Sequence, residues 1–213
     1  TLRGTSTPVV VGTTVIAGFD NGRVVASGLA NGEARWEVVL APPVGRSDLD
    51  RLADIDGSMA VVGQDVYAAG YHGRTAALAA ESGQILWSRE ISTNVGLGVN
   101  ADQVFVVSES GELVAMDRQT GTERWRQDAL VRRNPTAPVP YEGTVVVGDF
   151  EGYVHFFSAE DGSPVTRERV DGHRVSGAPV VIGGRLYVQS ETGRLKAFEI
   201  ARPKQRVAET DAR

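Results

Sequence analysis

Two carboxylates placed two positions apart, Asp54 and Asp56 in the segment DRLADID, have the spacing that most suggests chemistry in this chain. Alternate aspartates occur in calcium-binding loops, but the rest of that loop pattern is missing here. The three histidines, His72, His155 and His173, have no metal-ligand spacing between any two of them. The sequence therefore predicts no metal site.

Nucleophilic and phosphate-binding chemistry is also unsupported by the sequence. The chain has no cysteine, which excludes disulfides, thiolate metal sites and cysteine catalysis. No nucleophile-elbow, Walker or dinucleotide-binding glycine pattern occurs. Arg132 and Arg133 form a small basic spot that is more typical of a solvated loop than of a phosphate site. We expect no catalytic residue and no cofactor.

Composition sets wide limits on the class of protein. The chain has 213 residues, of which 41% are hydrophobic, and a net charge of −5. This is enough apolar sequence for a sizeable core, and the acidic balance gives no reason to expect nucleic acid or an anionic membrane surface as a partner. No apolar run approaches the length of a membrane-spanning helix.

The elements that would position any site follow from an internal repeat. The three tryptophans, Trp36, Trp87 and Trp125, each stand four residues after one glycine and 14 after another. With this spacing the chain divides into five units: about 7–40, 57–91, 97–130, 136–170 and 177–200. In each unit a short apolar piece precedes a β-branched run, a glycine turn and an alternating strand. The first four units then add a second glycine turn and a last strand.

The repeat predicts an all-β fold. The β-branched runs have strand length and are bounded by turns; they are TVIAGF (14–19), DVYAAG (65–70), QVFVVS (103–108), TVVVGD (144–149) and RLYVQS (185–190). Glycine in the turns supplies positive φ, and its frequency argues against a helical solenoid. Four antiparallel strands per unit of about 40 residues are typical of a β-propeller blade.

We therefore expect four full blades and a three-stranded fifth over residues 1–200, in a single domain, with a polar C-terminal tail at 201–213. The tryptophans fall on the fourth, outermost strand, where an indole can cover the gap between neighbouring blades, so we expect a structural blade-docking role rather than ligand stacking. The fourth unit has Thr166 in this slot, which predicts a weaker junction there. Val207 in the tail falls in the corresponding slot of the fifth unit.

These residues resemble a known family. The segment AMDRQTGTERW (115–125) resembles the tryptophan-docking repeat of quinoprotein-like propellers. More closely, TLRG (1–4), DRLADID (50–56) and VVVGDFEGYVHFFSAEDG (145–162) resemble the BamB family, lipoprotein subunits of the bacterial outer-membrane β-barrel assembly (Bam) complex. The resemblance covers nearly the whole chain, and it includes segments outside the repeat.

The resemblance implies a C-terminal half of an eight-bladed propeller, with a signal sequence, an acylated cysteine and about four more blades upstream. It implies a non-catalytic scaffold, lipid-anchored at the periplasmic face of the outer membrane of a Gram-negative bacterium, that binds the POTRA domains of BamA and other Bam subunits. Unfolded outer-membrane proteins are a weaker candidate partner, through β-augmentation at the sheet edges.

Topology predicts that Asp54 and Asp56 lie on one face of the propeller. About 13 residues are inserted between the first two units, over 42–56, and long connections in compact repeats often carry function. Connections between successive blades all emerge on one face, so Leu2, Arg3, Asp54 and Asp56 should be neighbours. In the family these motif positions are tied to BamA binding; an arginine–aspartate bridge that only shapes the loop remains an equal alternative.

Two other functions remain open. One is a quinone (PQQ)-dependent dehydrogenase-like enzyme of similar fold, against which the lack of cysteine counts, since those enzymes use an adjacent cysteine pair. The other is a half-propeller that acts only when two copies meet.

Overall fold

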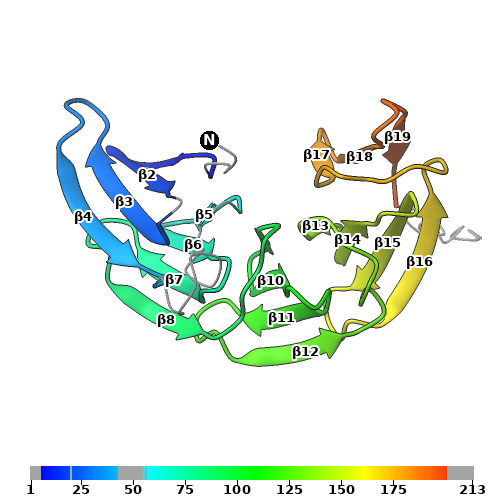
Figure 1. Cartoon of the computed structure of the whole chain (residues 1–213), viewed down its shortest axis with the longest axis horizontal. Coiled ribbons are helices and arrows are strands. Elements are labelled where there is room, and N and C mark those ends of the chain that lie inside the picture. Colours follow the sequence, from blue (N-terminus) through cyan, green and yellow to red (C-terminus); the bar gives the residue numbers. More distant parts are fainter. Residues whose placement is uncertain (1–5, 20, 43–54, 56, 201–213) are drawn as a thin grey trace, which may run out of the picture.

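The computed structural model describes residues 6–19, 21–42, 55 and 57–200, and their strands form five antiparallel sheets arranged as an open arc (Figure 1). The first sheet contains β1 (Val9–Val11), β2 (Thr14–Gly18), β3 (Arg23–Gly28) and β4 (Ala34–Val39). The second contains β5 (Ala60–Val62), β6 (Asp65–Ala69), β7 (Thr75–Ala79) and β8 (Ile85–Arg89).

The next two sheets repeat this order. The third contains β9 (Leu97–Val99), β10 (Gln103–Val107), β11 (Leu113–Asp117) and β12 (Glu123–Gln127). The fourth contains β13 (Val139–Tyr141), β14 (Thr144–Gly148), β15 (Tyr153–Ser158) and β16 (Pro164–Arg169). The fifth has three strands within the described residues, β17 (Val180–Ile182), β18 (Arg185–Gln189) and β19 (Leu195–Phe198). The predicted β-propeller fold is confirmed.

The core lies between the sheets rather than within one of them. Each of the four hydrophobic clusters joins two successive blades; for example, Ile16 and Val24 of the first blade pack with Val66 and Leu78 of the second. Because both faces of an inner blade are covered, β10 and β14 are buried along their whole length. The fourth strands β4, β8, β12 and β16 form the outside of the arc (Figure 1).

A β-bulge at the same place in four blades positions the tryptophan slot. The pairing of the third and fourth strands shifts register just before this slot, and the extra residue is Arg35, Leu86, Arg124 or Val165. Alanine stands opposite each tryptophan: Ala26, Ala77 and Ala115. A bulge re-aims the side chain that follows it, so the indoles leave their own sheet and reach the next one.

The fourth blade reverses the sizes of this pair. Phe156 stands opposite Thr166, so the large side chain is on the third strand instead of the fourth. The Phe156 ring makes an edge contact with Phe198 of the fifth blade at 5.7 Å between centroids. The Tyr141 hydroxyl donates to the Gly184 carbonyl oxygen at 2.9 Å across the same junction. No indole covers this junction in the described part of the chain, and β16 is exposed throughout.

One turn departs from the expected glycine chemistry. In the turn of residues 71–73, the positive φ belongs to His72 (51°) and not to Gly73. Gly73 is needed for a different reason, because a Cβ there would lie 2.5 Å from the Cβ of Ala41 in the preceding connection. The prediction that glycine supplies positive φ is therefore wrong at this turn.

Candidate functional site: the connector face

One face of the arc is built from two kinds of segment, which together we call the connector face. These are the connections between successive blades and the turns between the second and third strands. Backbone hydrogen bonds join them: Glu109 N–H donates to the Ser92 carbonyl, Phe150 N–H to the Arg133 carbonyl and Glu191 N–H to the Arg174 carbonyl, at 2.9–3.2 Å. Each of these three connections is thus fixed to the turn of the blade that follows it.

The four residues expected to contact a partner, Leu2, Arg3, Asp54 and Asp56, lie outside the described residues. So do Leu49 and Leu52 of the inserted segment and Val207 of the tail. Their neighbours Ser6 and Ile55 are described, and both are held in place.

Ser6 and Ile55 are fixed to the same strand end. The Ser6 hydroxyl accepts a hydrogen bond from Gly18 N–H at 2.7 Å, and this side chain is buried. Ile55 has no exposed surface, and its N–H donates to the Phe19 carbonyl at 3.2 Å. A Cβ on Gly18 would overlap the Ile55 side chain, so the glycine makes room for the isoleucine. Residues nearly 50 positions apart therefore meet at the end of β2.

The fourth blade contains the same arrangement without the insertion. Gly148 N–H donates to the Thr136 hydroxyl at 3.0 Å, and Val175 N–H donates to the Asp149 carbonyl at 2.9 Å. The side chain of Val175 is fully buried against Gly148. Anchoring a connection by an apolar residue on this glycine thus recurs in two blades, and the first blade uses it to hold Ile55 of the inserted segment.

A buried charge cluster stabilises the connector face at the fourth blade. The Asp149 side chain is fully buried and lies 2.6 Å from an Arg133 guanidinium nitrogen and 2.7 Å from His155 Nε2. Burial alone would raise the pKa of the Asp149 carboxyl, but hydrogen bonds from His155, the Tyr153 N–H and Arg133 outweigh it and lower the pKa to about 2. The carboxylate is therefore ionised, and Nε2 of His155 carries the proton that it donates.

Sequence reasoning missed this cluster. Arg133 was expected to be a solvated loop residue, and that interpretation is wrong, because its guanidinium pairs with Asp149 and with Glu151 at 2.7 Å. The available signal was the aspartate that ends TVVVGD, where other units have phenylalanine, glycine or serine.

The three tryptophans lie away from the connector face, on the fourth strands β4, β8 and β12, close to the turn that precedes each strand. The indole N–H groups of Trp36, Trp87 and Trp125 each donate to a main-chain carbonyl of the following blade at 2.9–3.0 Å. The acceptors are Ala80, Arg118 and Ala159. Each ring also covers a glycine of that blade, namely Gly83, Gly121 and Gly162.

The histidines do not come together. His72 stacks on Tyr71 at 3.9 Å, His155 belongs to the cluster around Asp149, and His173 is exposed beside Asp171. Within the described ranges, no group of three or more histidine, aspartate or glutamate residues could hold a metal ion. That part of the chain also contains no helix with the length and apolarity needed to cross a membrane.

Comparisons with known proteins agree with this architecture. The family model described as outer membrane protein assembly factor BamB matches residues 1–127 and 115–205. The chain is 43% identical to BamB of Pseudomonas aeruginosa over 94% of its own length and 53% of that protein. It is 40% identical to BamB of Yersinia pestis, over 92% of the chain and 50% of that protein.

A solved structure gives the same result. The crystal structure of BamB from Moraxella catarrhalis aligns with a TM-score of 0.86 and 31% identity, covering 93% of this chain and 60% of that one. The chain thus spans about half the length of the curated relatives that it matches. By sequence and by fold, it belongs to the BamB family of outer membrane protein assembly factors.

Proposed function

We propose that this chain is part of a non-catalytic scaffold of the outer-membrane protein assembly machinery, and that its connector face binds the POTRA domains of BamA. Leu2, Arg3, Asp54 and Asp56 are the proposed contact residues. The observation that carries this proposal is the convergence of Ser6 and Ile55 on the end of β2. The names of the relatives supply the class of process.

Short lengths of chain connect the anchors to the proposed contacts. Arg3 precedes Ser6 by three residues, which span at most about 10 Å when fully extended. Asp54 and Asp56 flank Ile55 directly. The anchors therefore support a joint surface of one arginine and two aspartates, although these residues are distant in sequence.

The same proximity supports an arginine–aspartate bridge within the chain. Such a bridge would hold the inserted segment and present Leu2 to the partner. An exposed pair contributes only about 0–1 kcal/mol to stability, so its removal would leave the fold intact while changing the surface. Binding and stability measured on the same variants separate the two roles.

The location follows from the same family. We propose that the intact protein acts at the periplasmic face of the outer membrane of a Gram-negative bacterium, held there by a lipid anchor. Cells that produce the intact protein are treated with an inhibitor of lipoprotein processing. The mass of the protein and its membrane fractionation are then compared with those from untreated cells. Unchanged fractionation and unchanged mass would contradict an anchor.

The test of the binding proposal is a calorimetric titration of the intact protein with soluble BamA POTRA domains. The variant Asp54→Ala/Asp56→Ala is compared with the control Glu81→Ala/Glu160→Ala. The control removes the same charge from exposed turns on the opposite face. We expect the first variant to weaken binding at least about tenfold and the control to bind normally.

Equal binding by the wild type and the Asp54→Ala/Asp56→Ala variant would place the interface elsewhere. Equal losses in both variants would show a dependence on net charge alone. In an Arg3→Ala background, a further loss from the aspartate changes indicates direct contact, whereas no further loss indicates a bridge within the chain.

A further inference from the structure

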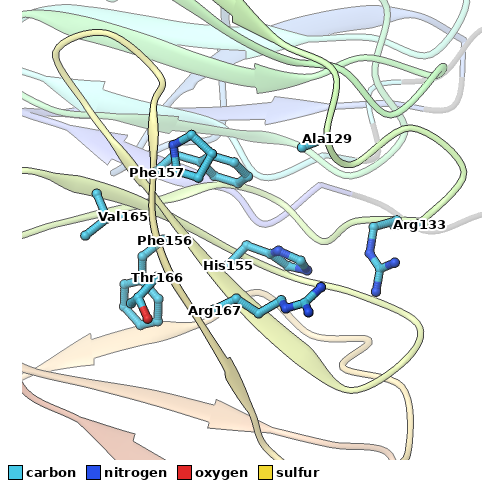
Figure 2. Close-up of a pocket in the computed structure, with 9 residues that line it drawn as sticks. Ala129, Arg133, His155, Phe156, Phe157, Val165, Thr166 and Arg167 are labelled. Atoms are coloured by element: carbon cyan, nitrogen blue, oxygen red, sulfur yellow. The ribbon is translucent and has the colours of Figure 1, made fainter.

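A pocket of about 330 Å³ lies on the outer side of the fourth blade, against the connection from the third blade. Figure 2 shows two kinds of side chain in its wall: Arg133, His155 and Arg167 gather on one side, and Phe157 and Val165 lie on the other. Pro164 and Ala129 add to the apolar part. The pocket is thus divided into a cationic half and an apolar half.

In the described part of the chain, Arg167 lacks the acidic partner that the corresponding arginine has in the preceding blade. In the third blade, Arg126 pairs with Glu112 at 2.8 Å. In the fourth blade, Arg167 takes the place of Arg126, but Tyr153 takes the place of Glu112. The Arg167 guanidinium therefore lies over the Tyr153 ring at 4.8 Å and has no carboxylate partner among the described residues.

Further cations adjoin the same ring. The guanidinium groups of Arg169 and Arg133 lie 5.4 and 6.0 Å from the centre of Tyr153. Of the three, Arg133 is neutralised by Asp149 and Glu151, whereas Arg167 is not. A planar guanidinium held on an aromatic face keeps its N–H edge free for a carboxylate.

His155 supplies a polar atom without a protein partner. Its side chain is 10% exposed, and its Nε2 is occupied by Asp149. Its other ring nitrogen, Nδ1, has no hydrogen-bond partner in the part of the chain that the structure describes. With the proton on Nε2, Nδ1 is an acceptor, so it can receive a hydrogen bond from an N–H or O–H group of a ligand but not from a carboxylate.

The dimensions fit a small amphiphilic ligand. A protein cavity of about 150 Å³ holds benzene, so this pocket has room for a ring and a polar group. The apolar half presents the exposed side chains of Val165 and Pro164 to an apolar group, and the cationic half has Arg167 for an anion. We propose that this pocket binds a carboxylate that carries an apolar or aromatic group, with Arg167 holding the carboxylate.

Two sources share this chemistry: a small organic acid and the C-terminal residue of a polypeptide. The proposal does not depend on binding of BamA, because the residues concerned are distinct from Leu2, Arg3, Asp54 and Asp56. Failure of one proposal therefore leaves the other untouched.

The probes are 3-phenylpropionate, its uncharged amide 3-phenylpropanamide, and inorganic phosphate, each titrated into the intact protein by ligand-observed NMR. We expect 3-phenylpropionate to bind in the millimolar range and the amide to bind at least about tenfold more weakly. Equal binding of the acid and the amide, or binding of phosphate alone, would overturn the proposal.

Variants of pocket residues, compared with a control variant in the third blade, test whether the ligand binds in this pocket. Arg167→Gln should weaken binding of 3-phenylpropionate at least about tenfold, whereas Arg126→Gln, in the same slot of the third blade, should leave it unchanged. Val165→Asp puts a negative charge on the exposed apolar wall and should also abolish binding. Unchanged binding in both pocket variants, with folding verified by thermal unfolding, would rule out this pocket.

The source is identified with glycyl-glycyl-phenylalanine and its C-terminal amide. Tighter binding of the peptide acid than of 3-phenylpropionate would assign the pocket to polypeptide C-termini. Binding of 3-phenylpropionate without the peptide would assign it to small acids. Either result supports the carboxylate site, and binding of neither would refute it.

Discussion

The indole of Trp87 is seated on Gly121 of the next blade. Its N–H donates to the carbonyl oxygen of Arg118 at 2.9 Å, and a Cβ added to Gly121 would lie 2.5 Å from the ring. The Arg89 side chain, two residues further along the same strand, donates to the Gly121 carbonyl at 2.8 Å. One short turn thus receives both the ring and the cation of the preceding blade.

Because the Trp87 ring packs directly on Gly121, we expect Gly121→Ala to be strongly destabilising. Gly121 has a φ of +67°, which alone costs about 1–2 kcal/mol for alanine, and the overlap with Trp87 adds about 1–3 kcal/mol. Gly143→Ala is the matched control, because Gly143 has a φ of +77° and open space around its Cβ position. Urea unfolding should show the larger loss for Gly121→Ala, and equal losses would show that the ring contact is unimportant.

In the fourth blade the large side chain of the pair is Phe156 on the third strand and the small one is Thr166 on the fourth strand, and two substitutions can restore the order found in the first three blades. Phe156→Ala should reduce stability by about 3–5 kcal/mol, because the ring leaves a cavity against Phe198. Adding Thr166→Trp recreates the alanine–tryptophan pair of the first three blades. The double variant should recover at least about 1 kcal/mol in urea unfolding. If it is no more stable than Phe156→Ala, the fourth junction cannot use the indole. The predicted weakness of this junction would then gain support.

The Asp149 cluster predicts a loss of stability in acid. The pKa of Asp149 falls from 3.8 to about 2 in the folded state. A carboxyl whose folded-state pKa is depressed adds stability above its unfolded-state pKa, and this is lost as pH falls from about 4 towards 2. The shift corresponds to about 2 kcal/mol.

Asp149→Asn cannot titrate and tests this assignment. At pH 7 it should be less stable than the wild type, because Arg133 loses a buried partner. Between pH 5 and pH 2.5, however, it should lose about 1.5 kcal/mol less stability than the wild type, because part of the effect is lost only below pH 2.5. Asp117 and Asp171 also have pKa values lowered to about 2, but they titrate in both proteins and cancel. Parallel pH profiles would contradict the assignment.

Ile55 should act on partner binding without touching the partner. Ile55→Ala removes the side chain packed on Gly18 and should lower stability by on the order of 2 kcal/mol. Because Ile55 holds the segment that carries Asp54 and Asp56, the affinity for BamA POTRA domains should also fall, by about tenfold or more.

Val175→Ala is the control for this prediction. Val175 fills the same slot in the fourth blade, so its loss should reduce stability comparably. Calorimetry on both folded variants should show weaker binding for Ile55→Ala alone. Equal affinities would show that the inserted segment does not depend on this anchor.

The strands could be predicted because local chemistry sets them. The run TVVVGD predicted a strand at 144–149, and β14 occupies Thr144–Gly148. The predicted outermost position of Trp87 also agrees with its place on β8. Alternation and turn glycines act over a few residues, so such features are visible in the sequence.

The contacts between blades could not be predicted in the same way. Arg133 meets Asp149 because a connection lies against the turn of the following blade, and this depends on how two sheets are placed. The size exchange at Phe156 was likewise hidden, since Thr166 suggested only a missing ring. The proposed contacts at Arg3 and Asp54 remain predictions, because they lie outside the described residues.

The acceptors of the indole N–H groups are main-chain carbonyls, belonging to an arginine once and to alanines twice. Every residue type carries that oxygen, so the receiving blade can change its side chains without losing the joint. A duplicated blade would fit its new neighbour from the outset, needing only the small turn residue beneath the ring. Lengthening of the arc and divergence of its surfaces can therefore proceed separately during evolution.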